Sequence, residues 1–340
     1  MLQDRKNEHL DVVLNGLGQS RARTGFDDIM FEHVALPELH MDEIDLQTVF
    51  LGKQTSAPLL VSSMTGGPAR AAEINRHLAL ACQEMGIALA VGSQRIALEG
   101  DKAAGIDADL RQWAPDIPLL ANFGAAQLNL GYGLEQARRA VGMIGADALI
   151  IHLNPLQEAV QPEGDRDWRG LLKRIETLAS ALGVPLVVKE VGAGITGRLA
   201  RQLVDAGVAA IDVAGAGGTS WAAVEAERAK SPEQAAIARA FVDWGTPTAY
   251  AIKSVREACP DAVVIGSGGV RDGLDVAKAI RLGADMVGQA AGILQAAIVS
   301  PEAVLASLRV TVAQLRVACF CTQSANLAEL KNANLLRQIP

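Results

Sequence analysis

Eight short apolar runs recur along the chain, and each of them ends in small or polar residues. They begin at Pro58, Ile87, Pro118, Ala148, Pro185, Ala209, Ala262 and Asp285. Apolar residues follow one another in these runs without alternating with polar ones, so the runs predict strands that are buried on both faces. Segments rich in Ala, Leu and Arg at helical spacing, such as the one that begins at Arg70, separate the strands.

This alternation of strands and helices favours the α/β class with a parallel sheet and right-handed crossovers. Eight such units within residues 58–292 predict a (β/α)₈ TIM barrel. An open, doubly wound sheet is the structural alternative. Its usual G-x-G-x-x-G turn does not follow the first apolar run, which favours the barrel.

We expect residues 1–340 to form a single domain. Two regions of it, and a C-terminal segment, lie outside the regular repeat of strands and helices. Residues 1–57 form an N-terminal arm and extension, and residues 219–248 form a long loop after the sixth strand. A long loop in a compact enzyme is often a lid, although a subunit contact is an equal alternative. Residues 293–340 are predicted to form a C-terminal helical segment.

Composition narrows the class of protein. The net charge of −7 argues against a nucleic-acid-binding protein, but a cleft can still be locally positive for a small anion. The four cysteines match no disulfide or metal-site spacing and indicate reduced thiols. The charged N-terminus lacks a signal-peptide core, and no run approaches the roughly 18 apolar residues of a membrane span. We therefore expect a soluble, cytoplasmic protein without membrane contact.

Chemistry in a TIM barrel belongs at the carboxyl ends of the strands. The seventh run ends at Gly266, Gly268 and Gly269, and a helix is predicted to begin near Asp272. Glycine turns at a helix N-terminus let an anion approach main-chain N–H groups, and phosphate sites recur after the seventh and eighth strands of this fold. The sequence therefore predicts a phosphate site there, belonging to a substrate or to a cofactor.

The motifs at the strand ends resemble those of type II isopentenyl diphosphate isomerase over nearly the whole chain. Arg5 and Lys6 with His9 are followed in order by SSMTGG, VGSQR, ANFGAAQL, HLNPLQE, VVKEVG, DVAGAGGTSW and GSGGVRDG. The resemblance implies a flavin-dependent isomerase of isoprenoid biosynthesis that interconverts isopentenyl and dimethylallyl diphosphates. It also implies FMN, Mg²⁺, NADPH as the reductant, and a homo-oligomer, either a tetramer or an octamer.

The resemblance assigns roles to individual residues. FMN contacts are expected from Ser63, Met64, Thr65, Ser93, Asn122, Lys189, Thr219, Gly269, Val270, Arg271, Ala290 and Ala291. Substrate contacts are expected from Arg5, Lys6, His9, Ser93, Gln94, Arg95, His152, Asn154, Gln157 and Trp221. Glu158 is the expected ligand of Mg²⁺, a cation that prefers oxygen ligands and bridges to phosphate.

Gln157 and Lys189 are the residues to which we assign catalytic roles. Lys189 ends an apolar strand, where a buried ammonium needs a partner. The anion of reduced flavin would be that partner. Alternatively, Lys189 forms a purely structural ion pair with Glu190 or Asp212. Gln157 would position or relay a proton in a 1,3-proton shift for which reduced FMN is the acid and base. A direct role for Glu158 in proton transfer stays open. The alternatives without a function are that His9 is a surface residue and that Glu158 is a solvated loop carboxylate.

Other functions are weighed against the isomerase. An FMN-dependent oxidoreductase of the 2-hydroxy-acid oxidase type would use a late histidine base, but no histidine follows His152. A dehydrogenase with a Cys or Ser base is less easily excluded, although none of the four cysteines lies at a strand end. A Schiff-base aldolase would need a lysine on the sixth strand. A phosphate-binding barrel without catalysis would leave the polar strand ends without a purpose.

Overall fold

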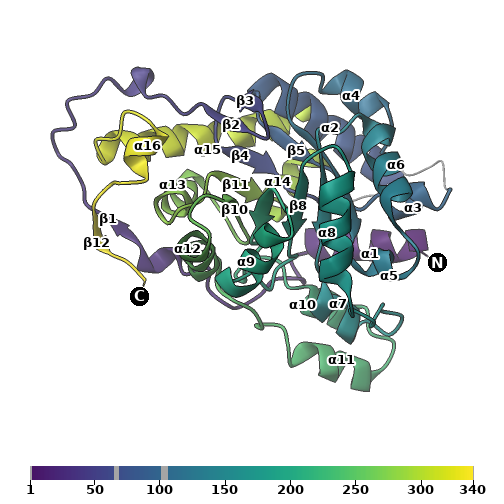
Figure 1. The fold of residues 1–340 in the computed structure, drawn as a ribbon. Coiled ribbons are helices and arrows are strands. Elements are labelled where there is room, and N and C mark those ends of the chain that lie inside the picture. Colours follow the sequence, from purple (N-terminus) through teal and green to yellow (C-terminus); the bar gives the residue numbers. More distant parts are fainter. Residues whose placement is uncertain (1, 65–68, 101–105, 340) are drawn as a thin grey trace.

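The computed structural model of the chain describes residues 2–64, 69–100 and 106–339. Eight strands close into a barrel in the order β10-β11-β4-β5-β6-β7-β8-β9, and each neighbouring pair is parallel (Figure 1). The predicted TIM barrel is confirmed, and closure of the sheet excludes the open doubly wound alternative. The strands are β4 (Leu59–Val61), β5 (Ala88–Ala90), β6 (Leu119–Gly124), β7 (Ala148–His152), β8 (Leu186–Lys189), β9 (Ala210–Asp212), β10 (Val263–Ser267) and β11 (Met286–Gln289).

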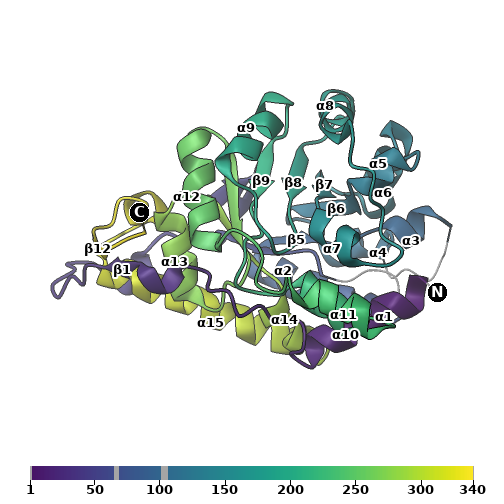
Figure 2. The ribbon, with the colours of Figure 1, turned by 90° about the horizontal axis from the view of Figure 1, so that it is seen from below.

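Helices surround the barrel and alternate with its strands (Figure 2). The helix predicted from Arg70 is α2, and the Asp272 side chain caps α13 by accepting N–H bonds from Leu274 and Asp275. The outer helices are α2 (Ala69–Met85), α4 (Asp109–Trp113), α6 (Leu134–Ile144), α8 (Leu171–Ala181), α9 (Gly197–Asp205), α12 (Thr248–Ala258), α13 (Gly273–Arg281) and α15 (Pro301–Cys321). Shorter helices lie in the connections, namely α3 (Arg95–Leu98), α5 (Ala126–Asn129), α7 (Pro155–Val160), α14 (Ala291–Ala297) and α16 (Leu327–Leu330).

The barrel interior is packed with side chains over its lower part and becomes polar at the carboxyl ends of the strands. Leu120, Ile150, Val187 and Ile265 belong to one buried apolar cluster, together with Phe50 from outside the barrel. Successive residues of a strand point to opposite faces, so the residue two positions after each of these also points inward. Those inward residues are Asn122, His152, Lys189 and Ser267. Four strands with apolar residues inside the barrel therefore each place a polar side chain inward at their carboxyl end, and these side chains form a polar layer.

A partly buried carboxylate ties the start of β7 to its neighbours. Asp147 accepts hydrogen bonds from Arg111 Nη2, from Lys53 Nζ and from the Leu119 main-chain N–H, each at 2.8 Å. Burial alone would raise the pKa of the Asp147 carboxyl, but the hydrogen bonds from Lys53, Leu119 and Arg111 hold it below its usual range. These contacts join β6, β7 and the hairpin of β2 (Thr48–Phe50) and β3 (Lys53–Thr55) at the end of the barrel opposite its polar layer.

The same arrangement recurs half a barrel further on, before β11. Asp285 accepts hydrogen bonds from Arg256 Nη2 and from Lys331 Nζ, both at 2.6 Å, and from the Val264 main-chain N–H at 3.0 Å. Asp147 and Asp285 both follow a Gly-Ala pair, and both partner arginines precede an x₃-Pro-Asp stretch. Two of the eight strand units are therefore fastened by the same set of side chains.

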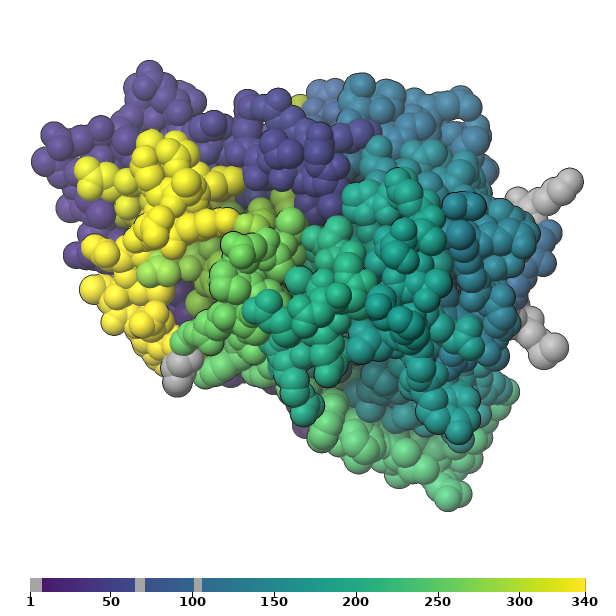
Figure 3. Space-filling model, in the orientation of Figure 1, coloured from purple at the N-terminus to yellow at the C-terminus, as the bar shows by residue number. Residues whose placement is uncertain are grey.

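The N-terminal extension begins with α1 (Leu2–Leu14) and then runs along the outside of the barrel. It contains η1 (Phe26–Asp28), β1 (Met30–Phe31), η2 (Met41–Glu43) and the β2–β3 hairpin (Thr48–Phe50 and Lys53–Thr55). Strand β1 pairs antiparallel with β12 (Leu335–Arg337), so part of the N-terminal extension lies beside the C-terminal segment (Figure 3). The extension is thus attached to the barrel along much of its length.

The predicted loop at residues 219–248 contains two helices, α10 (Trp221–Glu227) and α11 (Pro232–Arg239). Ser220 and Ser231 cap them with their hydroxyl groups, which explains where each helix begins. Helix α10 packs against α1, α7 and α11 (Figure 2). Two segments outside the regular repeat therefore meet each other above the polar end of the barrel.

Helix α15 is the one helix of the described ranges that is long and apolar enough to cross a membrane by length and composition alone. The search for long apolar runs in the sequence did not find this helix, because polar residues interrupt its apolar residues. It packs against α2, α13 and α14. Gln314 on this helix accepts the Gly273 main-chain N–H at 2.8 Å, and Arg316 donates to the Met41 oxygen at 3.3 Å. These contacts are those of the last outer helix of a barrel.

Candidate active site

A cavity of about 300 Å³ lies at the carboxyl ends of the barrel strands, and side chains of α1 and α10 contribute to its wall. Its volume is within the usual range of ligand sites. Most of the residues predicted from the sequence line it, although they come from every part of the chain. They are His9, Ser63, Met64, Ser93, Arg95, Asn122, His152, Asn154, Gln157, Glu158, Lys189, Thr219, Trp221, Gly269, Val270, Ala290 and Ala291.

Lys189 lies at the bottom of the cavity and is only 7% exposed. Its Nζ donates to the Glu190 main-chain oxygen at 2.6 Å, and not to a carboxylate. An ammonium has three donors, so the others are available to a bound group. The purely structural ion pair with Glu190 or Asp212 is therefore not what the structure shows.

Two buried carboxyl groups flank Lys189. Glu190 Oε2 accepts main-chain N–H groups of the turn after β8, including Val191 at 2.6 Å and Gly192 at 2.7 Å. Asp212, opposite Lys189 in the β8–β9 register, accepts the Ser267 hydroxyl at Oδ1, while its buried Oδ2 has no hydrogen-bond partner among the described residues. Burial raises the pKa of both carboxyl groups. Lys189, which lines the cavity, is thus flanked by buried acids whose charged forms are disfavoured.

The cavity has the features expected of a site for a large polar cofactor. The Ser62 and Ser63 hydroxyl oxygens are buried and lack a hydrogen-bond partner within the described residues, although buried polar atoms are normally paired. At the opposite wall the glycine turns after β9 and β10 approach so closely that a Cβ on Gly218 would lie 2.6 Å from the Gly269 nitrogen. Only main chain therefore fits there, and main-chain N–H groups in such turns bind anions.

His152 is oriented by the neighbouring strand. Its Nδ1 is 2.8 Å from Asn122 Oδ1, and Asn122 Nδ2 donates to the Val91 main-chain oxygen at 3.1 Å. An amide oxygen can only accept, so Nδ1 carries the proton and Nε2 is the atom that can accept or take up another proton. Asn122 was predicted to contact a flavin; its amide is engaged with His152 and β5.

Helix α7 brings Asn154, Gln157 and Glu158 onto one face. It begins at Pro155, a residue suited to the first helical position, and residues three and four apart are neighbours on a helix. Asn154 Nδ2 donates to Glu158 Oε1 at 2.8 Å and to Gln157 Oε1 at 3.2 Å. The Asp165 N–H donates to Glu158 Oε2 at 2.7 Å. Glu158 is therefore a positioned carboxylate, not a mobile loop side chain.

Glu225 on α10 connects three parts of the site, and the sequence did not single it out. Its Oε1 accepts from Gln157 Nε2 at 3.0 Å and lies 3.0 Å from His9 Nε2, while Oε2 accepts from Arg228 at 2.7 Å. Burial alone would raise the pKa of the Glu225 carboxyl, but His9, Gln157 and Arg228 hold it below its usual range. His9 also packs edge-to-face on Trp221 at 5.1 Å. His9 is therefore not a lone surface residue.

Arg95 is the cation at the other side of the cavity. Its Nε donates to Glu99 Oε1 at 2.9 Å, and its Nη1 donates to Asp165 Oδ2 at 3.3 Å. The guanidinium is thus held by two carboxylates in the structure. Because the Asp165 N–H also binds Glu158, this aspartate links the positive and the negative group of the site.

Two of the predicted residues are not brought into the cavity. Gln94 is fully buried: its amide nitrogen donates to the Ala140 oxygen and its amide oxygen accepts the Asn122 N–H, both at 2.9 Å. Both ends of this amide are used inside the protein, which corrects its assignment to substrate binding. The Arg271 guanidinium and main-chain N–H both donate to Asp275, so this side chain is not directed at a phosphate in the cavity.

Three further predicted residues cannot be compared with the structure. The side chains of Arg5 and Lys6 on α1, and the whole of Thr65, lie outside the described part of the chain. Glu158 does not belong to a cluster of three or more His, Cys, Asp or Glu side chains, since none is found within the described residues.

Curated relatives cover almost the whole chain. An isopentenyl-diphosphate delta-isomerase of Stutzerimonas stutzeri is 65% identical over 99% of this chain and 97% of the relative. Proteins of the same name from Cronobacter sakazakii and Nostoc are 58% and 50% identical, each over 99% of this chain and over 97% and 96% of the relative. The family model described as FMN-dependent dehydrogenase matches residues 153–337.

Solved structures confirm the fold at a greater distance. A mutant flavocytochrome b2 with pyruvate bound is 16% identical and aligns with a TM-score of 0.71 over 96% of this chain and 82% of that one. A mandelate oxidase is 17% identical with a TM-score of 0.66 over 99% and 98% of the two chains. At such identities the likeness concerns the barrel alone.

Proposed function

The chain belongs to the isopentenyl-diphosphate delta-isomerase family, and we propose that it interconverts isopentenyl and dimethylallyl diphosphates in the cavity at the strand ends. Relatives of that name share up to 65% identity over 99% of the chain. The observation that carries the proposal is the hydrogen bond from Gln157, which lines the cavity together with Lys189 and Arg95, to the buried Glu225 carboxylate behind it. Cations in the cavity and a buried anion next to it suit the two ends of such a substrate.

The reaction adds a proton at the terminal alkene carbon and removes another next to the diphosphate, without net oxidation. When bound in its reduced form, FMN supplies the proton exchange. The protein must then hold the diphosphate, keep water from the alkene and stabilise the positive charge that develops there. Preorganised charges in a water-poor site are an effective way to stabilise such a charge.

The residues fit an FMN molecule lying across the barrel end. Lys189, with donors to spare, would hold the electron-rich edge of the reduced ring. The hydroxyl oxygens of Ser62 and Ser63, which have no partner among the described residues, would find partners on the polar parts of the cofactor. Gly218 and Gly269 would present main-chain N–H groups to its phosphate.

The diphosphate end of the substrate would lie between Arg95, His152 and α7. Arg95, whose partner Glu99 is exposed, would bind phosphate oxygens, and His152 lines the same cavity. Glu158 would hold Mg²⁺ together with phosphate oxygens and water, which suits a lone carboxylate because Mg²⁺ usually keeps several waters. Arg5 and Lys6 on α1 complete this set as predictions from the sequence.

The alkene end would lie beside Gln157 and Trp221. Gln157 is held by Glu225, whose lowered pKa keeps it ionised at neutral pH. A buried carboxylate one amide away from the alkene favours positive charge on the substrate carbon. His9 and Trp221 in edge-to-face contact close this side against water. Gln157 thus positions the reacting carbons, and Glu225 supplies the electrostatic support behind it.

An FMN-dependent 2-hydroxy-acid oxidase is the alternative suggested by the shared barrel. Such an enzyme needs a base at the end of a late strand, and β10 and β11 end in Ser267 and Gln289 instead. The low identity of the oxidase structures supports only the common fold. The isomerase reading is therefore preferred.

NADPH as the reductant, a cytoplasmic location and a tetramer or octamer are further parts of the proposal. Exposed apolar side chains lie at and beyond the end of α14 and along α15, namely Val299 at 67%, Val310 at 57% and Val317 at 47%. Exposed apolar side chains on these helices are candidates for a subunit contact. Light scattering of the purified protein would measure the assembly.

The activity is tested with purified protein, FMN, NADPH, Mg²⁺ and radiolabelled isopentenyl diphosphate under anaerobic conditions. Acid-labile dimethylallyl diphosphate should accumulate until equilibrium is reached. Formation of no labelled product by flavin-loaded protein would reject the proposed function.

A further inference from the structure

Part of the N-terminal extension runs along the glycine turn that follows β9. The Ser20 N–H donates to the Gly218 oxygen at 2.9 Å, and the Ser220 N–H donates to the Gly18 oxygen at 2.8 Å. Gln19 and Thr219 form an antiparallel bridge between these bonds. Gly218 and Thr219 line the cavity, so the extension is hydrogen-bonded to one of its walls from outside.

Thr24 lies between that turn and the one after β10. A Cβ on Gly217 would lie 2.5 Å from Thr24 Cγ2, and a Cβ on Gly269 would lie 2.7 Å from the same methyl group. Both glycines have positive φ, 122° and 67°. Thr24 itself is fixed because its main-chain oxygen accepts the Ala249 N–H at 2.9 Å. The methyl group of Thr24 therefore fills the space between the two turns.

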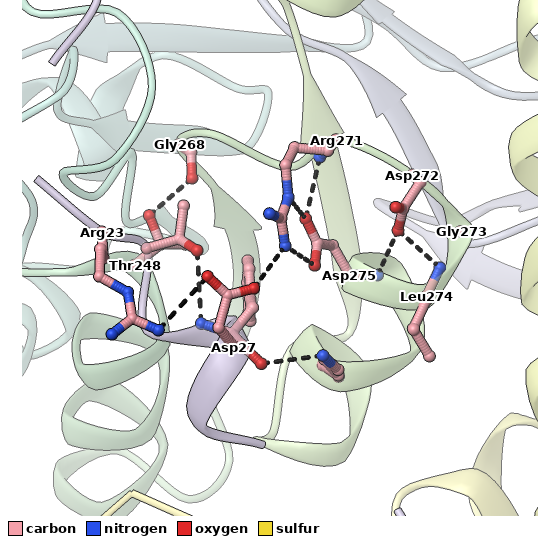
Figure 4. A network of polar contacts seen from close by, with 12 residues as sticks. Arg23, Asp27, Thr248, Gly268, Arg271, Asp272, Gly273, Leu274 and Asp275 are labelled. Carbon is pink, nitrogen blue, oxygen red and sulfur yellow. Dashed lines mark hydrogen bonds and ion pairs between the residues drawn. The ribbon is translucent and has the colours of Figure 1, made fainter. Parts of the chain in front are cut away.

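An ion-pair network fastens the end of this segment to α13 (Figure 4). Arg271 forms a two-pronged contact with Asp275, at 2.8 Å from Nε and 3.0 Å from Nη2, and the same Nη2 donates to Asp27 Oδ1 at 3.0 Å. The hydrogen bond and charge of Arg271 hold the pKa of Asp27 below its usual range. Lys278 adds a bond from Nζ to the Phe26 oxygen at 2.9 Å.

We propose that residues 18–27 form a clamp that sets the affinity for the cofactor phosphate, with Asp27 as its positioning residue. The proposal rests on the phosphate lying between Gly218 and Gly269, as in the proposed function. Neither Asp27 nor Arg271 lines the cavity. They would affect the cofactor indirectly, because Arg271 ends the turn after β10 that contains Gly269. The clamp would hold the turns after β9 and β10 together before FMN binds. Less conformational entropy is then lost on binding, and the affinity for FMN is higher.

Release of FMN from the holoenzyme on dilution, followed by the fluorescence of free flavin, tests the clamp. Asp27→Asn should raise the dissociation constant about two- to fivefold, in line with a partly exposed ion pair. Asp27→Lys faces Arg271 with a like charge and should raise it about tenfold. Asp28→Asn is the matched control, because Asp28 lies beside Asp27 and pairs instead with Arg337 near the C-terminus.

Hydrogen exchange separates a clamp from a merely stabilising contact. FMN should slow amide exchange in residues 18–27 of the wild-type protein, because coupling between two sites is reciprocal. That protection should shrink in Asp27→Lys and persist in Asp28→Asn. Equal FMN release by wild type and Asp27→Lys, or equal weakening by both neighbouring substitutions, would overturn the clamp. Failure of the wild-type protein to hold FMN would instead overturn the cofactor assignment.

Discussion

The Gln157 side-chain amide donates to the buried Glu225 carboxylate across 3.0 Å, which joins the helix after β7 to the helix after β9. Glu225 lies 68 residues further along the chain, in a segment outside the regular barrel repeat. The same carboxylate binds His9 of α1 and Arg228. One acidic side chain therefore assembles three separate segments over the cavity.

Glu225→Gln should lower kcat about 100-fold while FMN stays bound. The substitution keeps the shape of the side chain but removes the buried negative charge, and misplacement of a positioned group by about 1 Å can cost that much. Steady-state isomerisation at saturating FMN measures it. Glu227→Gln on the same helix changes an exposed carboxylate and serves as the control. A kcat within about twofold of wild type would show that Glu225 has no part in the reaction.

Glu158→Gln should raise the Mg²⁺ concentration needed for half-maximal activity by at least about tenfold. An amide binds a hard cation more weakly than a carboxylate does, and the flavin absorption should not change because Glu158 is assigned to the metal. Glu163→Gln, in the exposed turn that follows, is the matched control. Unchanged metal dependence in the Glu158 variant would remove Mg²⁺ from this position.

The number of product molecules formed per NADPH separates an isomerase from an oxidoreductase. Protein with oxidised flavin should be inactive until NADPH or dithionite reduces it. With limiting NADPH under anaerobic conditions, dimethylallyl diphosphate should then greatly exceed the NADPH consumed. A one-to-one ratio is the result an oxidoreductase would give, and it would contradict the proposed function.

Asp147→Asn should lower the stability of the fold by about 1–2 kcal/mol at neutral pH, because it weakens charged hydrogen bonds to Lys53 and Arg111. The folded pKa of Asp147 is lowered, so its stabilising contribution is present above the ordinary carboxyl pKa of about 4 and is lost as the pH falls through the folded value. Denaturant unfolding at several pH values checks this.

The difference in stability between wild type and Asp147→Asn should therefore shrink as the pH falls below about 4. Asp261→Asn is the control, because Asp261 is an exposed residue just before β10. Its stability relative to wild type should not change with pH in this way. A difference that stayed constant down to low pH would mean that the charge of Asp147 does not stabilise the fold.

The sequence by itself determined the barrel and the position of its chemistry. Strands buried on both faces have a local signature, a continuous apolar run, and each of the eight runs became a barrel strand. The cap at Asp272 was equally readable, since its partners lie two and three residues away. Asn154, Gln157 and Glu158 were also found together because one short helix holds all three.

Only the tertiary structure decided which polar side chains face the cavity. Gln94 and Arg271 stand in motifs at strand ends, yet their partners Ala140, Asn122, Asp27 and Asp275 turn them away from it. Glu225 carried no local signal, because its partner His9 is 216 residues away. Hydrophobic periodicity records burial along one element, whereas the direction of a polar side chain depends on donors and acceptors that folding brings from distant parts of the chain.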